Sequence, residues 1–384
     1  MAHKRYLFTP GPTPVPPQVL AALAEPVLHH RAPDFREVYS RVLGRLKQVH
    51  RTENEVLLFT CSGTGAFESA IVNLCSPGEP VLAVSAGSFG ERWVSMARRF
   101  GCHVEQLRYA WGETPTADDL RRKLEQVEPV SLVFLVHSET STGVVSDVRE
   151  LAAVAKEAGA LVVVDAVSSL GAVPLEQDEW GLDVVVAGSQ KALLTPPGLA
   201  TASVSPAAWE QVARATLPSF YFDWERTRKA QEKLDSAFTP AVSLIVALDV
   251  ALGLLLADGL ESAFERHVRL GRACRAGIKA MGLELFSPDE DRAAVVTAAR
   301  MPDGIEAREL TLALRERHGV TIAGGQGELK EAIFRIGHIG WYDEFDVATA
   351  LNAVELVLHE LNAPIERGVA ASRALEVYAE GTPV

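Results

Sequence analysis

Between residues 55 and 194, short apolar runs alternate repeatedly with stretches of helical periodicity. Continuous apolar runs are typical of strands buried on both faces, and their alternation with helices indicates a parallel sheet covered on both sides. The sequence therefore predicts an α/β protein with a mostly parallel sheet sandwiched by helices. The strand-like runs are EVLLFT (55–60), PVLAVS (80–85), SLVFLV (131–136), ALVVV (160–164) and DVVVA (183–187). Helical patterns are found at 18–25, 35–49, 91–100, 148–158, 259–281, 305–318 and 344–361, and two further strand-like runs at 293–300 and 331–336.

Polar residues follow these runs. Thr64, the group at 139–142, Asp165 and Lys191 each come a few residues or fewer after a predicted strand. Because ligands of such sheets bind beyond the carboxyl ends of the strands, we expect one crevice to collect them. Asp165 is informative, since a carboxylate that ends a buried strand needs a partner to offset its desolvation. The alternative is that Asp165 caps the next helix or turn.

Lys191 lies in DVVVAGSQKALL (183–194), where a buried strand opens into the predicted crevice. Partial burial and a neighbouring cation lower the pKa of such an amine and free it to form a Schiff base with a carbonyl cofactor. The alternative is a solvated loop lysine, because lysines usually stay exposed.

A glycine turn, CSGTG (61–65), separates the first strand from a helix-like stretch at 66–75. Strand, turn and helix in this order aim backbone N–H groups at a phosphate, and Ser62 and Thr64 add hydroxyl donors. The turn matches neither standard nucleotide motif, and no acidic residue follows about 20 positions on. A mononucleotide or a small phosphorylated cofactor suits it better than a dinucleotide, with a plain tight turn as the alternative.

Length and composition narrow the class. A chain of 384 residues is long enough for two domains, since single cores stop growing near about 250 to 300 residues. The net charge of −13 argues against nucleic acid or an anionic membrane surface as partner. The apolar run 241–257 contains Asp249 and is shorter than the roughly 20 residues of a membrane span, so it predicts a buried helix.

The start of the chain has no apolar core of signal-peptide length before its prolines, so secretion is not expected. Its cysteines are scattered without C-x-x-C spacing, which favours a cytoplasmic protein and predicts no metal site. The four cysteines are Cys61, Cys75, Cys102 and Cys274.

Five segments in this order resemble the class V aminotransferases, which are fold-type I pyridoxal-phosphate enzymes. The likeness is greatest to the alanine- or serine-glyoxylate branch and covers nearly the whole chain, from the FTPGPTP arm (8–14) onward. Near relatives in this family also carry the label of a soluble hydrogenase subunit, which these residues do not support. The segments are SGTG (62–65), SETSTG (138–143), VDAVSSLG (164–171), AGSQKAL (187–193) and RIGHIG (335–340).

The resemblance implies that Lys191 holds pyridoxal 5′-phosphate as a Schiff base and that Asp165, 26 residues earlier, pairs with its pyridine nitrogen. A carboxylate there keeps the ring protonated, which makes the ring an electron sink when the substrate loses its α-proton. Lys191, once displaced by substrate, is the amine that moves this proton.

The resemblance also implies a phosphate site. Its members are Thr64, Gly65 and Ala66 in the turn, Gln190, and Thr239 from the neighbouring subunit of a homodimer. Three residues before Thr239, where mammalian glyoxylate enzymes have a tyrosine that reaches the phosphate, this chain has Ser236. The contact from the partner subunit is therefore an open question.

Three further positions match the family. Thr140 corresponds to a side chain near the phenolic oxygen of the cofactor. Phe89 stands where a tryptophan often stacks on the ring; it can stack but offers no N–H. Arg335 corresponds to the arginine that grips the α-carboxylate of the substrate, a role that suits its planar fork of donors, with a surface salt bridge as the alternative.

The family pattern implies a large cofactor-binding domain at 17–255 and a smaller α/β domain formed by 1–16 and 256–384, which includes the N-terminal arm. Active sites are expected at the interface of a homodimer. Closure of one domain on the other would exclude water from the site.

The leading hypothesis is transamination between a small amino acid, alanine or serine, and glyoxylate or another small 2-oxo acid. The small residues of the arm, Gly11, Pro12 and Thr13, favour a pocket for substrates with short side chains. Dicarboxylate substrates are not excluded, because Arg31 or another arginine could enter the site. A cysteine desulfurase or another class V lyase is the alternative; a desulfurase needs a reactive cysteine on a mobile loop, whereas Cys274 lies in a helical pattern. A redox or hydrogenase subunit would need clustered cysteines as metal ligands.

Overall fold

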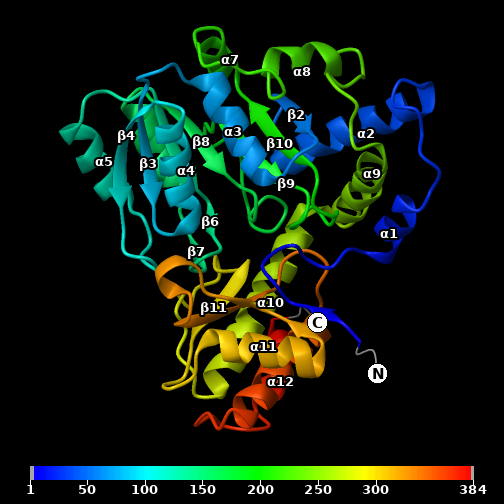
Figure 1. Cartoon of the computed structure of the whole chain (residues 1–384), viewed down its shortest axis with the longest axis vertical. Coiled ribbons are helices and arrows are strands. Elements are labelled where there is room, and N and C mark those ends of the chain that lie inside the picture. The colour runs from blue at the N-terminus through cyan, green and yellow to red at the C-terminus, as the bar shows by residue number, and fades with distance from the viewer. Residues whose placement is uncertain (1–3, 382–384) are drawn as a thin grey trace.

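A seven-stranded sheet forms the centre of the larger part of the computed structural model (Figure 1), which describes residues 4–381. β10 runs antiparallel to both of its neighbours, and all other pairs are parallel. In spatial order the strands are β2 (Glu55–Phe59), β10 (Ala200–Val204), β9 (Val184–Gly188), β8 (Leu161–Asp165), β5 (Leu132–Val136), β3 (Pro80–Ser85) and β4 (His103–Arg108).

The five strands predicted from apolar runs are confirmed, and two were missed. β4 is an edge strand whose side chains are exposed or half-buried, so it lacks an apolar run. β10, ATASV, is fully buried but built of small residues that carry little hydrophobic signal. The mostly parallel α/β sheet is thus as predicted, with one antiparallel strand inserted between β2 and β9.

The sheet has a hydrophobic core on each face. Along β8, Val162 and Val164 point into one core and Val163 into the other, as the two-residue period of a strand requires. Helices α2, α6 and α9 line the first core, and α3, α4 and α7 the second. Burial on both faces explains why these strands are apolar throughout.

Nine helices of the described chain surround the large sheet or adjoin it. Those predicted at 18–25, 35–49, 66–75, 91–100, 148–158 and 241–257 are confirmed, whereas α5, α7 and α8 were not predicted. The nine are α1 (Pro17–Leu23), α2 (Pro33–His50), α3 (Gly63–Leu74), α4 (Ser88–Arg99), α5 (Ala117–Gln126), α6 (Val148–Glu157), α7 (Pro206–Val212), α8 (Trp224–Gln231) and α9 (Val242–Leu256).

The apolar run that contains Asp249 is the buried helix α9, as predicted. The Asp249 carboxylate accepts from Arg41 at 2.8 Å and from Arg45 at 2.5 Å, both on the adjacent α2. In residues 4–381, no single helix is long and apolar enough to cross a membrane. Only α9 and the following α10 (Gly259–Ala280) together reach that length and apolarity, and they are bent by 81° relative to each other.

A three-stranded antiparallel sheet and four helices form the smaller part, which lies below the large sheet in Figure 1. The predicted strands at 293–300 and 331–336 and the helices at 259–281, 305–318 and 344–361 are confirmed, and α13 was missed. The elements are β11 (Val296–Arg300), β14 (Ile333–Gly337), β13 (Ala323–Gly324), α10 (Gly259–Ala280), α11 (Ala307–His318), α12 (Glu344–Glu360) and α13 (Ala370–Glu380), with a short 3-10 helix at Gly327–Leu329.

The N-terminal arm joins the smaller part. β1 (Tyr6–Leu7) pairs in parallel with β12 (Val320–Thr321), and Phe8 is buried in the core of that part. α10 crosses between the parts, because its first turns lie in a core of the large sheet while later turns lie in the smaller core. The outermost residues assigned to the small domain, 1–3 and 382–384, lie outside the described residues.

Candidate active site

Asp165 and Lys191 line one cavity of about 240 Å³. Asp165 ends β8, and Lys191 follows β9, its parallel neighbour, so the carboxyl ends of adjacent strands bring the two together. Both side chains are buried. The cavity is also lined by Gly11, Pro12, Ser62, Gly63, Thr64, Phe67, Phe89, Arg92, Ser138, Val167, Ser168, Gln190 and Pro197.

The Asp165 carboxylate has little support within the chain. One of its oxygens accepts from the backbone N–H of Val167 at 2.8 Å. Among residues 4–381, no cation lies within ion-pair distance of it. A buried carboxylate in this state indicates a cationic or N–H partner supplied from outside the chain.

The Lys191 amine is held by the N-terminal arm. Its Nζ donates to the carbonyl of Pro10 at 2.8 Å. Gly11 follows at φ +151°, and a Cβ placed on it would lie 2.3 Å from Lys191 Cε. Only a glycine therefore lets the arm approach this closely.

Burial is the main cause of the pKa shifts of both groups. Desolvation lowers the pKa of Lys191 to about 8; Asp165 opposes this shift, while Arg335 and Arg92 add to it. Desolvation raises the pKa of Asp165 to about 7, opposed by the Val167 N–H and by Lys191 and Arg92. A lysine with a lowered pKa is a better nucleophile toward a carbonyl near neutral pH.

The predicted phosphate turn is the N-terminus of α3, and its Thr64 lines the cavity. The backbone N–H groups of Gly65 and Ala66 both donate to Ser62 O, whereas those of Gly63 and Thr64 have no acceptor within residues 4–381. The loop after β8 packs closely here, since a Cβ on Gly63 would lie 2.8 Å from Val167 Cγ2. The helix end therefore presents two unused donors and its positive dipole end.

Phe89 lines the cavity from the first turn of α4. A buried carboxylate from another segment fixes this turn, because Glu139 accepts from the N–H groups of Phe89 at 2.9 Å and Gly90 at 3.0 Å. Glu139 also accepts from the Ser141 hydroxyl at 2.5 Å. Burial raises the pKa of Glu139, and these four hydrogen bonds, including one from Ser141 N, oppose that shift.

Gln190 lines the cavity next to Lys191, and its Oε1 is buried without a hydrogen bond within the described chain. Thr140 and Arg335 lie just outside the lining. The guanidinium of Arg335, on β14, donates to Thr140 O at 2.6 Å and to Gly324 O at 2.7 and 2.9 Å. Arg335 thus joins the two parts of the molecule beside the cavity.

Arg335 is buried, and it forms no ion pair with a carboxylate in residues 4–381. The expected alternative of a surface salt bridge is therefore wrong. Desolvation lowers the pKa of Arg335 to about 10, with Glu139 opposing the shift. A guanidinium has five N–H groups, and three of them serve these backbone contacts. Two N–H groups remain without an acceptor in residues 4–381.

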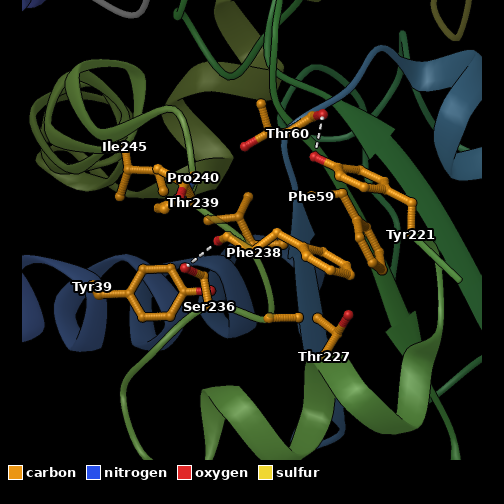
Figure 2. A pocket seen from close by; sticks show the side chains of 12 residues that line it. Tyr39, Phe59, Thr60, Tyr221, Thr227, Ser236, Phe238, Thr239, Pro240 and Ile245 are labelled. Atoms are coloured by element: carbon orange, nitrogen blue, oxygen red, sulfur yellow. Dashed lines mark hydrogen bonds between the residues drawn. The ribbon is translucent and has the colours of Figure 1, made fainter. Parts of the chain in front are cut away.

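Thr239 does not line this cavity. It belongs to a second, smaller cavity with Ser236, where Tyr39 and Tyr221 also contribute (Figure 2). Ser236 Oγ donates to Phe238 O at 2.7 Å, and Tyr221 donates to Thr60 O at 3.3 Å (Figure 2). Since Thr239 lines this second cavity and not the first, it would meet the other predicted residues only if a second chain supplied it.

A family model, aminotransferase class-V, matches residues 5–334 of this chain. The chain belongs to the class V aminotransferases. Its cofactor is pyridoxal 5′-phosphate, and its reaction class is transamination.

Several relatives of this aminotransferase match over almost the full length of both chains. The soluble hydrogenase small subunit of Synechococcus sp. (strain PCC 6716) is 43% identical over 98% of this chain and 99% of its own. The L-aspartate–glyoxylate aminotransferase of Paracoccus denitrificans (strain Pd 1222) is 36% identical over 100% and 98%. The ureidoglycine-glyoxylate aminotransferase structure from Bacillus subtilis matches with a TM-score of 0.94 at 32% identity over 99% of each chain.

The cavity fits this cofactor. A buried carboxylate with one hydrogen bond suits a protonated pyridine nitrogen, and a lysine of lowered pKa suits the aldehyde. Unused N–H donors on α3 and the unpaired oxygen of Gln190 are further polar groups that a bound molecule would satisfy.

The other two hypotheses have no support in the described chain. None of its four cysteines lines the cavity, and burial raises the pKa of Cys274 to about 11, so a desulfurase thiol is missing. In residues 4–381 there is no group of three or more His, Cys, Asp or Glu side chains placed to hold a metal ion. The described residues therefore show no metal-ligand set of the kind that a metal-holding hydrogenase subunit would need.

Sequence reasoning missed three contributors to the site. The Pro10 carbonyl is invisible because backbone groups leave no sequence signal. Glu139 was grouped with strand-end residues, yet its role as the cap of α4 depends on tertiary contact. Arg92 was findable, because it lies three residues after Phe89 and so shares its helix face.

Proposed function

We propose that this aminotransferase transfers an amino group between a small amino acid, such as alanine or serine, and glyoxylate or another small 2-oxo acid. The observation that carries the proposal is the contact of the Pro10–Gly11 arm with the Lys191 amine. Because the Pro10 carbonyl lies 2.8 Å from the amine and a Cβ on Gly11 would overlap the Lys191 side chain, the space beside the reacting carbon suits short substrate side chains.

The names of two relatives support the acceptor. The Paracoccus denitrificans and Bacillus subtilis proteins are both named for glyoxylate, while their amino donors, aspartate and ureidoglycine, differ. A shared acceptor with varied donors suggests that the contacts for glyoxylate lie in the common part of the site. The specificity for the amino donor is then determined by residues around this common part, such as those of the arm.

We assign roles as follows. Bound pyridoxal phosphate supplies the electron sink that makes the α-proton of an amino acid removable. Lys191 holds the cofactor and, when displaced, carries the proton on its Nζ. Asp165 pairs with the ring nitrogen, and Phe89 covers the ring face. Arg335 binds the α-carboxylate through its two remaining N–H groups.

The rest of the predicted phosphate set is retained in this proposal. Thr64 and Gln190 line the cavity on the side assigned to the phosphate. Gly65 and Ala66 belong to the same first turn of α3, outside the lining, and their N–H groups donate to Ser62 O. Thr140 lies toward the phenolic oxygen, and its carbonyl orients Arg335.

We propose that the enzyme works as a homodimer in which Thr239 reaches the phosphate of the partner. Thr239 is remote from the cavity of its own chain. Beside it, Phe220 is 69% exposed and Tyr221 43% exposed, and both rings contact Phe238. Exposed aromatic clusters of this kind are typical of protein interfaces.

We further propose the domain division at 17–255 and at 1–16 with 256–384. The separate cores and the pairing of β1 with β12 support it, although α10 runs through both parts. A cytoplasmic location is proposed as well, because all four cysteines are free thiols.

The experiment is a matrix of amino donors against oxo acids. Alanine, serine, aspartate and ureidoglycine are each paired with glyoxylate, pyruvate and 2-oxoglutarate, and kcat/KM is measured. We expect glyoxylate with alanine or serine to exceed the other pairs. A preference for 2-oxoglutarate with aspartate would overturn the proposal and would indicate that an arginine such as Arg31 enters the site.

A further inference from the structure

Arg92 is a cation in the cavity to which neither the sequence motifs nor the proposed roles give a function. Its Nη1 donates to Thr64 Oγ1 at 2.9 Å, and its guanidinium lies 4.7 Å from the centre of the Phe89 ring. Arg92 forms no ion pair with any carboxylate in residues 4–381. The neighbouring Glu91 pairs instead with Arg108, at 3.2 Å.

The charges that line the cavity are few. They are the carboxylate of Asp165 and the cations of Lys191 and Arg92. A phosphate monoester carries a charge of about −1.5 to −2 near pH 7. The α3 terminus supplies roughly half a positive charge, and Lys191 is committed to the aldehyde and loses its charge as a nucleophile. Arg92 is then the one full cation left on the cavity wall for the phosphate.

We propose that Arg92 binds the phosphate of the cofactor from the same subunit, next to Thr64. The inference rests on the cofactor site proposed above. It names a phosphate monoester, rather than a substrate carboxylate, as the group that Arg92 recognises.

The geometry explains how Arg92 and Thr64 act together. Because Arg92 donates to the Thr64 oxygen, the hydroxyl hydrogen of Thr64 is free to point at an anion. Four of the five N–H groups of Arg92 remain unused by the described chain, and stacking on Phe89 fixes the plane of the guanidinium. The same contact links the phosphate to the ring that covers the cofactor.

This arrangement also answers the question raised by Ser236. The Ser236 hydroxyl donates within its own loop, to Phe238 O, and is short compared with a tyrosine. With Arg92 in place, most of the phosphate charge is balanced inside one subunit. The partner then needs to add only a neutral hydroxyl, such as that of Thr239.

The test compares pyridoxal 5′-phosphate with pyridoxal, which lacks the phosphate. Cofactor-free wild type, Arg92→Gln, Arg92→Lys and the control Arg99→Gln are titrated with each compound, and dissociation constants are obtained from absorbance. Arg99 is exposed on the last turn of the same helix, away from the cavity. Thermal unfolding of the cofactor-free proteins checks that each variant is folded.

We expect Arg92→Gln to lower the affinity for pyridoxal phosphate about 10- to 100-fold, which is the usual loss for charge-assisted hydrogen bonds. Its affinity for pyridoxal should equal that of wild type. Arg92→Lys should lie between wild type and Arg92→Gln, and Arg99→Gln should match wild type. An equal loss of affinity for both compounds would overturn the proposal. It would indicate that Arg92 acts on the cofactor ring by positioning Phe89.

Two other outcomes would also overturn it. Unchanged affinity for both compounds would remove Arg92 from the phosphate site. A raised KM for dicarboxylic amino acids, with cofactor affinity unchanged, would assign Arg92 to the substrate side chain. If wild type binds pyridoxal phosphate without forming the covalent link to Lys191, the proposed cofactor site fails, and that result is distinct from any effect of Arg92.

Discussion

Asp165 and Asp249 are both aspartates that the sequence places in apolar surroundings, yet the structure treats them differently. Asp249, in the middle of α9, is held by Arg41 and Arg45 from α2. Asp165, at the end of β8, has one backbone N–H and no ion pair within the described chain. The first charge is neutralised by the fold itself and supports packing. The second is left for a ligand.

The same contrast separates other charged residues. Lys156 donates to both carboxylate oxygens of Asp183, at 2.7 and 3.0 Å, whereas Lys191 has a single carbonyl partner. Arg275 pairs with Asp289 at 2.8 Å, whereas Arg335 contacts carbonyls alone. A buried charge without an ion-pair partner is costly, so the gathering of three such charges in and beside one cavity indicates function.

The largest predicted effect is that of Lys191→Ala, compared with Lys156→Ala. Loss of Lys191 removes the nucleophile and the proton carrier, so we expect transamination to fall by at least about 10⁴-fold. Lys156→Ala should keep its activity and unfold more readily, because Asp183 loses its partner. Steady-state assays and absorbance of the lysine-bound cofactor measure the first effect, and thermal unfolding measures the second. Transamination activity that survives in Lys191→Ala would show that Lys191 is not the functional lysine of this pair.

Asp165→Asn and Asp249→Asn come next. Asp165→Asn should lower kcat by about 10²- to 10⁴-fold, because an amide cannot keep the ring nitrogen protonated, and should not destabilise the fold at neutral pH. Asp249→Asn should destabilise the fold by about 1 to 3 kcal/mol and leave kcat unchanged, because two half-exposed arginines lose their partner. Assays and urea unfolding separate the effects. If Asp165→Asn instead destabilised the fold and Asp249→Asn lowered kcat, the presence or absence of an ion-pair partner would not distinguish a functional aspartate from a structural one.

Arg335→Lys is compared with Arg275→Lys. Lysine keeps the charge but lacks the planar fork, so Arg335→Lys should raise KM for the amino donor about 10- to 100-fold. Arg275→Lys should leave KM unchanged and lower the midpoint of thermal unfolding, since its contacts are to Asp289 and Ala293 O. An unchanged KM in Arg335→Lys would argue against the assigned carboxylate contact.

The last prediction concerns the pH dependence of stability in the cofactor-free protein. The pKa of Asp165 is raised by burial to about 7 in the folded chain, so its protonated form is favoured by folding. Its contribution to stability is fully present below the unfolded pKa near 4 and is lost as pH rises through about 7.

Relative to Asp165→Asn, wild type should therefore gain stability as pH falls from about 7 toward 4. The unfolding midpoints of the two proteins across this range measure the gain, and the difference between wild type and Asp249→Asn serves as the control. A difference between wild type and Asp165→Asn that does not change with pH would show that Asp165 stays ionised and is stabilised by other means.

The main features of the fold could be predicted from the sequence because they depend on local periodicity. Five buried strands and the long helices follow from apolar runs and helical stripes. β10 and β4 could not be predicted, since small residues and half-exposed polar residues carry no such period. The antiparallel place of β10 depends on contacts between distant segments.

The site divides in the same way. Lys191, Asp165 and Thr64 are marked by their positions after strands, and the chain itself brings them to one cavity. Thr239 carries no local mark of its distance from that cavity, and the arm, Glu139 and Arg92 show their contacts only when distant segments meet.

By itself the sequence determined the α/β class, the family resemblance and which charged residues end buried strands, because strand burial and motif order are properties of neighbouring residues. Only the tertiary structure decided which of those charges are neutralised by the fold and which are not. Counter-charges such as Arg41 for Asp249 come from 208 positions away. Whether a buried charge is satisfied is therefore decided by packing, and that property separates the candidate active site from the rest of the core.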